Sequence, residues 1–218
     1  MIRETHANGI KLTYREEGPP DAPLMVLLHG RTADHNGWNG ITQHFAKRYR
    51  VLVPDLRGHG RSEWPGAYAL PDMAEDIAAL LDGTPAVIVG HSLGGIVAYH
   101  LAAAHPELVE RLVLEDPPPP RPITGRAPLV EDDSTTFDWA MMHQTEAQFI
   151  GPDPAWKGAV RTITAPTLLF SGGPGSHVPS AEVAELIPGA RLVTIDVGHL
   201  IHENARAEFL REVDAFLS

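Results

Sequence analysis

The sequence predicts an α/β protein in which a mostly parallel sheet is covered by helices on both faces. Short apolar runs alternate with segments of helical periodicity along most of the chain, which is the order expected of parallel strands joined by crossover helices. The run at 24–28, Leu-Met-Val-Leu-Leu, is apolar throughout, as a strand buried on both faces requires. With 43% hydrophobic and 21% charged residues, the composition is that of an ordinary globular protein.

The first half of the chain supplies a hairpin and then the start of the alternating pattern. Asn8-Gly9 is a strong signal for a two-residue turn, which we expect to join strands at 2–5 and 11–15. Further strands are predicted at 24–28, 50–54, 86–89 and 112–115, and helices at 38–49, 71–81 and 93–105. The helix at 71–81 begins with proline and acidic residues and stops at Gly83, which suits the two ends of a helix.

The alternating pattern breaks after the strand at 112–115. Asp116 is followed by four prolines, which lack the N–H donors of a strand and cannot continue a central one. The pattern returns with strands at 167–171 and 191–195 and helices at 181–187 and 205–217. We therefore predict a core of residues 1–116 and 164–218, with a small lid formed by the insertion at 117–163. Such an insertion tends to lie over the carboxyl ends of the strands, where sites form.

Length, charge and composition exclude several classes of protein. The 218 residues include 17 basic and 28 acidic ones, and the net charge of −11 disfavours nucleic acid or other polyanions as partners. Cysteine is absent, which excludes disulfide scaffolds, thiolate metal sites and cysteine nucleophiles. No apolar run approaches the roughly 20 residues of a membrane span, and the N-terminus lacks the apolar stretch of a secretory signal. We expect a cytoplasmic protein without membrane attachment, whereas the sequence does not predict its oligomeric state.

The segment Gly90-His91-Ser92-Leu93-Gly94 follows an apolar strand and precedes a helix. A serine on such a sharp strand-to-helix turn is held outward in strained backbone geometry, where its hydroxyl is free to attack. Glycines two residues before and after it suit the turn, because a Cβ at either place would collide across it. The following helix directs its unpaired N–H groups at developing negative charge. We predict that Ser92 is a nucleophile.

The chain resembles the α/β-hydrolase family, and the resemblance rests on four motifs that occur in the family's order. His29-Gly30 resembles the oxyanion loop, and Asp-Leu-Arg-Gly-His-Gly-Arg-Ser at 55–62 resembles the Gly-rich loop after the next strand. The segment 90–94 resembles the nucleophile elbow, and Gly198-His199 resembles the loop that presents the catalytic base. The resemblance covers nearly the whole chain and implies a serine esterase or lactonase. We expect neither a cofactor nor a metal.

The remaining roles follow from chemistry and from this resemblance. Histidine titrates near neutral pH and can take the proton of a serine hydroxyl, and His199 follows a strand that ends at the same sheet edge as Ser92. The other histidines are explained more simply as loop, surface or lid residues, with His202 as the alternative base. Two backbone N–H groups are expected to hold the oxyanion. One belongs to Leu93, and the resemblance assigns the other to Arg31.

The acid is where this sequence departs from the family's usual pattern. Relatives commonly carry an aspartate in the loop after the strand at 167–171, but the loop at 172–179 contains no carboxylate. A minority of the family places its acid after the strand before the lid, where this chain has Glu115-Asp116. Successive strand residues point to opposite faces, so these two acids cannot both face His199. We predict Asp116, with Glu115, Asp196 or a degraded triad as alternatives.

Aromatic and methionine side chains in the insertion suit an adaptable apolar pocket, although packing of the lid onto the core also explains them. We expect Trp38, Trp139 and Met142 to line the substrate pocket. The predicted function is cleavage of a small carboxylic ester or lactone through an acyl-enzyme. Three alternatives stay open, namely a carbon–carbon bond hydrolase, a perhydrolase-like enzyme, and a ligand receptor on the same fold that turns over slowly or not at all.

Overall fold

The computed structural model describes residues 1–218 except 123, 126 and 134–135. Its strands are β1 (Ile2–Ala7), β2 (Ile10–Glu17), β3 (Leu24–Leu28), β4 (Arg50–Pro54), β5 (Ala86–His91), β6 (Val109–Glu115), β7 (Thr167–Ser171) and β8 (Arg191–Thr194). Within the described residues they form one eight-stranded sheet in the order β1-β2-β4-β3-β5-β6-β7-β8. All strands from β3 to β8 run parallel, and β1 and β2 add an antiparallel edge. The predicted α/β fold class is confirmed.

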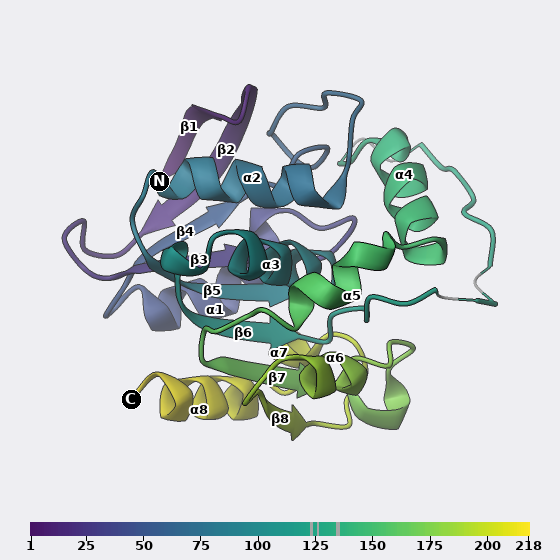
Figure 1. Ribbon diagram of the computed structural model, residues 1–218. Coiled ribbons are helices and arrows are strands. Elements are labelled where there is room, and N and C mark those ends of the chain that lie inside the picture. Colours follow the sequence, from purple (N-terminus) through teal and green to yellow (C-terminus); the bar gives the residue numbers. More distant parts are fainter. Residues whose placement is uncertain (123, 126, 134–135) are drawn as a thin grey trace.

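Helices lie on both faces of this sheet (Figure 1). They are α1 (Asn39–Phe45), α2 (Leu70–Leu81), α3 (Leu93–Ala104), α4 (Trp139–Ile150), α5 (Pro154–Val160), α6 (Ala181–Leu186), α7 (Ile201–Asn204) and α8 (Arg206–Leu217), with short 3₁₀ turns η1 (His35–Trp38), η2 (Pro106–Leu108) and η3 (Gly173–Gly175). Among the residues that the structure describes, no helix has both the length and the apolar character needed to cross a membrane.

The hairpin of β1 and β2 forms where the sequence predicts it. Asn8 and Gly9 both have positive φ, +50° and +79°, as a two-residue turn of type I′ requires. The register pairs Ala7 with Ile10 on either side of that turn. Because β2 also pairs antiparallel with β4, the hairpin extends the parallel part of the sheet.

The parallel strands are buried on both faces, as the apolar run at 24–28 indicates. In β3, Val26 and Leu28 pack in the core cluster that contains α2 and α3 side chains. Met25 and Leu27 point the other way, into the cluster with α1 and α8. This alternation of side chains is the ordinary consequence of strand geometry. It positions the ends of β3, β5 and β6 at one edge, between the two helical layers.

Two predicted helices differ in extent from the sequence pattern. The pattern predicts a helix over 38–49, but η1 precedes α1, and α1 ends at Phe45. The N–H groups of Arg48 and Tyr49 both donate to Phe45 O, which turns the chain tightly into β4. The helix predicted at 205–217 begins at Arg206, and the separate turn α7 comes before it.

The insertion between β6 and β7 contains α4 and α5. At the end of β6, Asp116 has φ +46°, so the chain turns sharply out of the sheet before the prolines. Met141 and Phe149 of α4 and Trp156 of α5 are buried in the same core cluster as α3. These contacts attach the insertion to the parallel sheet. The division of the chain into core and lid remains a prediction.

Candidate active site

Ser92 stands on a sharp turn between β5 and α3. Its φ of +52° and ψ of −113° lie in a region that residues with a side chain rarely occupy, at a cost of about 1–3 kcal/mol. The Ser92 N–H donates to Glu115 O at 2.9 Å, which ties the turn to the end of β6. A Cβ at Gly90 would overlap the Gly94 carbonyl, and one at Gly94 would overlap the Leu28 carbonyl. The turn therefore requires both glycines.

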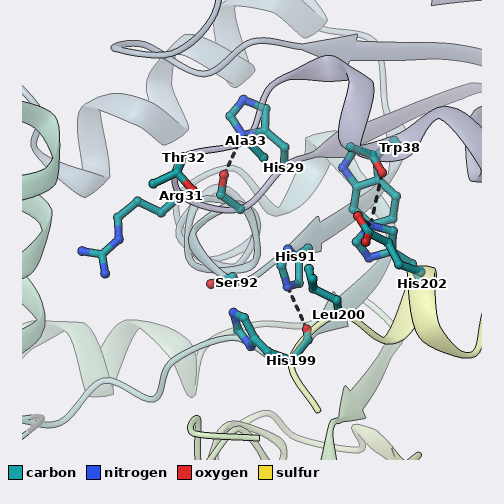
Figure 2. A pocket seen from close by; sticks show the side chains of 13 residues that line it. His29, Arg31, Thr32, Ala33, Trp38, His91, Ser92, His199, Leu200 and His202 are labelled. Carbon is teal, nitrogen blue, oxygen red and sulfur yellow. Dashed lines mark hydrogen bonds and ion pairs between the residues drawn. The ribbon is translucent and has the colours of Figure 1, made fainter. Parts of the chain in front are cut away.

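His199 lies beside Ser92 on the loop after β8 (Figure 2). Its Nδ1 is 2.7 Å from Oδ2 of Asp116. Because a carboxylate accepts hydrogen bonds, Nδ1 carries the proton, and Nε2 of the neutral ring is left as the basic nitrogen. Within the described residues, no hydrogen bond joins the Ser92 hydroxyl to His199. In free enzymes such catalytic hydrogen bonds are often long and tighten only with substrate.

The Asp116 carboxylate is fully buried and accepts four hydrogen bonds. Besides His199, its donors are the hydroxyls of Ser176 and Ser180, each at 2.5 Å, and the Gly172 N–H at 3.1 Å. Burial alone would raise the pKa of Asp116, but the hydrogen bonds from His199 and the two serines outweigh it and lower that pKa. The acid therefore faces His199 in its ionised form.

The two alternative acids contact other groups. Glu115 Oε2 is 2.8 Å from Nδ1 of His202, on the opposite side of the strand from Asp116. Asp196 Oδ1 accepts the Gly175 N–H at 3.1 Å. Of the three candidate acids, the structure brings Asp116 to His199.

The first predicted oxyanion donor, the N–H of Arg31, is oriented by His29. The Leu56 N–H donates to His29 Nε2 at 3.0 Å, so the proton of this ring is on Nδ1, which donates to Gly30 O at 2.8 Å. Burial lowers the pKa of His29, in agreement with a neutral ring. The C=O and N–H of a trans peptide point in opposite directions, so the Arg31 N–H is turned away from His29. Figure 2 shows Ser92 on that other side of the loop.

The second predicted donor, the N–H of Leu93, belongs to the first residue of α3. The N–H groups in the first turn of a helix have no partner within the helix. They also lie at the positive end of the helix dipole, which favours negative charge close to Ser92. The loop after β3 and the start of α3 thus supply one backbone donor each on the two sides of the nucleophile.

Ser92 and His199 line a cavity of about 410 Å³ at the carboxyl edge of the sheet. Its wall also includes the predicted pocket residue Trp38, together with Arg31 and His202. The described residues contain no group of three or more His, Asp or Glu side chains arranged to hold a metal ion. The nucleophile, the histidine and the loop after β3 thus form parts of one cavity wall.

The other two predicted pocket residues do not line this cavity. Met142 is 6% exposed and packs in the core cluster of α3. Trp139 packs on the edge of that cluster, and its Nε1 donates to Asp132 O at 3.1 Å. From α4, Glu146 and Phe149 contact the cavity wall at Arg31: Glu146 Oε2 is 2.8 Å from a guanidinium nitrogen, and the guanidinium lies 5.3 Å from the centre of the Phe149 ring.

Three further histidines lie close to His199, namely His91 and His177, which the sequence assigned to loop, surface or lid, and His202, the alternative base. His91 Nε2 donates to His199 O at 2.9 Å, and the His177 ring lies 4.7 Å from the His199 ring. His202 is bound to Glu115 behind them. Glu115 and His202 stand 87 residues apart, and no spacing in the sequence indicated that they would pair.

Comparisons with known proteins agree with this fold. The family described as alpha/beta hydrolase fold matches residues 23–158. The chain is 32% identical to the Magnesium-chelatase 30 kDa subunit of Rhodobacter capsulatus over 87% of this chain and 85% of that protein. It is 40% identical to Lipase LipV of Mycobacterium tuberculosis over 50% of this chain, a stretch that spans 42% of the lipase.

Among solved structures, the enol-lactonase from Burkholderia xenovorans LB400 superposes with a TM-score of 0.77 at 25% identity, and the match covers 99% of each chain. The family match and the relative aligned over most of both chains agree with the sheet described above. This chain belongs to the α/β hydrolase fold family.

Proposed function

We propose that this protein is a serine hydrolase that cleaves a small carboxylic ester or lactone through an acyl-enzyme. The observation that carries the proposal is the arrangement of Ser92, His199 and Asp116 at the end of the sheet, with the Asp116 carboxylate 2.7 Å from His199 Nδ1. A serine, a histidine that can take its proton, and an ionised acid that orients the histidine are the parts of a nucleophilic triad. Relatives named as a lipase and an enol-lactonase support the ester and lactone classes.

The acylation step uses each group in one role. His199 Nε2 takes the hydroxyl proton of Ser92 as its Oγ attacks the carbonyl carbon of the substrate. Asp116 keeps its hydrogen bond to Nδ1–H and stabilises the imidazolium that forms. The N–H groups of Arg31 and Leu93 donate to the oxyanion. The imidazolium then gives its proton to the leaving oxygen, the C–O bond breaks, and the acyl group remains on Ser92.

Deacylation repeats the same chemistry with water. His199 removes a proton from the water that attacks the acyl carbon, and the proton returns to Ser92 Oγ as the acid product leaves. Substrate, water and the three side chains supply every proton and electron pair in both steps. The cavity of about 410 Å³ suits a small acyl group or lactone ring. The cytoplasmic location and a small-molecule substrate without nucleic acid or membrane partners remain predictions.

The test is turnover of p-nitrophenyl esters of increasing chain length beside a set of lactones. We expect a burst of p-nitrophenol followed by steady turnover, and labelling of Ser92 by a fluorophosphonate. Ser92→Ala should fold like the wild type by circular dichroism and retain less than about 1% of its kcat, because only the attacking oxygen is lost. The matched control is Ser218→Ala, whose exposed hydroxyl bonds to Asp214 O at the C-terminus.

Two results would contradict the proposal. Turnover by Ser92→Ala at more than a few per cent of the wild-type rate would show that another group is the nucleophile. A single burst in the wild type without steady turnover would instead indicate a receptor that is acylated once. The lactone set distinguishes ring opening from ester cleavage, because a lactone is hydrolysed to a single hydroxy acid, whereas an ester gives an acid and a separate alcohol.

A further inference from the structure

A second histidine–carboxylate pair lies directly behind the first. Glu115 is 0% exposed and His202 is 4% exposed. Glu115 Oε1 accepts the His202 backbone N–H at 2.9 Å, and its Oε2 is 2.8 Å from His202 Nδ1. Burying a carboxylate without a partner would cost much folding free energy, so the fold depends on the contact between Glu115 and His202. No step of the proposed mechanism uses it.

The hydrogen-bond partners of His202 determine its protonation state. Nδ1 faces the Glu115 carboxylate, and Nε2 is 3.2 Å from the carbonyl oxygen of Gly37. Both partners can only accept hydrogen bonds, whereas a neutral imidazole has one donor nitrogen. Both ring nitrogens must carry protons to make both bonds, so His202 is an imidazolium in this arrangement.

Two further observations agree with a positive charge on His202. Its ring stacks on Trp38 with 4.3 Å between centroids and 27° between planes, and the face of an indole attracts a cation. Burial alone would lower the pKa of His202, but the Glu115 carboxylate outweighs burial and raises it. Trp38 belongs to the core cluster formed with α8, and the His202 ring also lies 6.3 Å from the ring of Phe209 in that cluster.

This charged ring joins the segments that carry the site. Glu115 ends β6 one residue before Asp116, and Gly37 lies on the loop after β3 that also carries Arg31. His202 itself lies in α7, directly after the loop of His199. The rings of His202 and His91 have 5.3 Å between their centroids, and Figure 2 labels both side chains in the cavity wall.

We propose that His202 is a positively charged positioning residue that, bound to Glu115, fixes the segment carrying His199 against the loop that contains Gly37. His202 touches no reacting atom and acts through the backbone of His199. Loss of either ring proton breaks one of its two side-chain bonds and leaves the start of α7 less firmly held, with its backbone N–H still bonded to Glu115. A displacement of about 1 Å at a catalytic group costs on the order of 10²-fold in rate.

The charge is tested by NMR of wild-type protein labelled with ¹⁵N-histidine at about pH 7.5. We expect two protonated ring nitrogens for His202, identified because both signals are missing from His202→Gln. The titratable groups that face this ring are Glu115 from β6, Glu203 of α7 at 3.8 Å and His91 from β5. A single protonated nitrogen on His202 would overturn the assignment of a charge.

The positioning role is tested by kinetics, and this part rests on the proposed function. For p-nitrophenyl acetate, His202→Gln and Glu115→Gln should lower kcat by about 10- to 100-fold with little change in KM. The wild type should lose activity on the alkaline side as His202 deprotonates, whereas His202→Gln should lack that limb. A structural role alone would lower thermal stability and leave the pH profile unchanged.

The matched controls are His105→Gln and Glu75→Gln, because His105 Nε2 and Glu75 Oε1 form an exposed pair at 2.9 Å far from the cavity. Both controls should keep wild-type kcat. Wild-type kcat and an unchanged alkaline limb in a folded His202→Gln would overturn the positioning role. If the proposed chemistry itself fails, the wild type will not turn over esters, and the two ring signals will still support the charged state of His202.

Discussion

Nδ1 of His199 lies 2.7 Å from Oδ2 of Asp116, an acid at the end of β6 rather than in the loop after β7. The loop after β7 contains no carboxylate, but its Ser176 and Ser180 donate their hydroxyl protons to Asp116. Asp116 therefore follows β6, and its two serine donors follow the neighbouring parallel strand β7. A buried carboxylate needs such donors to stay ionised. Burial raises the pKa of Asp116, but the hydrogen bonds from these donors and from His199 lower it by more.

The first prediction concerns this acid. Asp116→Asn keeps the size of the side chain but offers an amide, which can stabilise the wrong tautomer of His199. The corresponding change in a serine protease triad costs on the order of 10⁴ in kcat, and we expect a loss of at least about 10²-fold in steady-state ester turnover. Asp196→Asn is the control, since Asp196 bonds to the Gly175 N–H. Near wild-type activity in Asp116→Asn would remove Asp116 from the triad.

The second prediction concerns the donors to Asp116. Ser180 is 0% exposed, and its Oγ is 2.5 Å from Asp116 Oδ1. Ser180→Ala removes one of the two donors to that oxygen and leaves it only the Gly172 N–H, so we expect a loss of about 1–3 kcal/mol in the free energy of unfolding. The pKa of Asp116 should rise, and kcat should fall by about tenfold. Urea unfolding and pH–rate profiles measure these effects, and an unchanged unfolding free energy would contradict them.

The third prediction is the pH dependence of stability from the pair of Glu115 and His202. The pKa of His202 is raised above 6.5, so its contribution is fully present below that value and is lost as the pH rises through the folded pKa. The pKa of Glu115 is lowered below 4.5 despite burial, so its contribution is present above 4.5 and is lost as the pH falls. Together they stabilise the fold most between these two values.

This dependence is measured as the difference in unfolding free energy between wild type and His202→Gln. We expect the difference to be largest between about pH 4.5 and 6.5 and to shrink as the pH rises to about 9. The matched comparison uses His105→Gln, which removes a partly exposed histidine beside Glu75. A difference between wild type and His202→Gln that stays constant over this whole range would contradict the prediction.

Features determined by neighbouring residues could be predicted from the sequence. Asn8-Gly9 predicts its hairpin because both residues tolerate positive φ, and they adopt it. The segment 90–94 predicts a strand-to-helix turn because glycines are needed on both sides of the strained Ser92. The alternation of apolar runs with helical segments likewise predicts the parallel sheet.

Features determined by long-range contacts could not be predicted. Glu115 and His202 are 87 residues apart, and nothing local to either one indicates the pair. The helix predicted at 38–49 is shorter because the chain must turn at Phe45 to enter β4. The exception is the contact between Asp116 and His199, which was predicted from the resemblance to a minority of the family. Strand alternation added only that Glu115 and Asp116 cannot both face His199.

The last prediction concerns α4 and substrate length. Met142, Glu146 and Phe149 are spaced three and four residues apart, so they share one face of the helix. Glu146 contacts Arg31 at the cavity wall, and the Arg31 guanidinium lies over the Phe149 ring at 5.3 Å. An acyl chain too long for a cavity of about 410 Å³ would extend past Arg31 toward this face. We propose that Met142 contacts such chains, while short ones do not reach it.

Met142→Ala should therefore lower stability and change chain-length preference together. Truncation of a buried methionine costs about 2–5 kcal/mol in unfolding free energy. The ratio of kcat/KM for octanoyl over acetyl p-nitrophenyl esters should change by the equivalent of about 1–3 kcal/mol, with the acetyl value unchanged. The matched control is Met73→Ala on α2, which removes a buried methionine from the same core cluster. Trp139→Ala is measured in the same way, because Trp139 is the other predicted pocket residue of α4. An equal ratio in Met142→Ala and Met73→Ala, with stability lowered in both, would assign Met142 to packing alone.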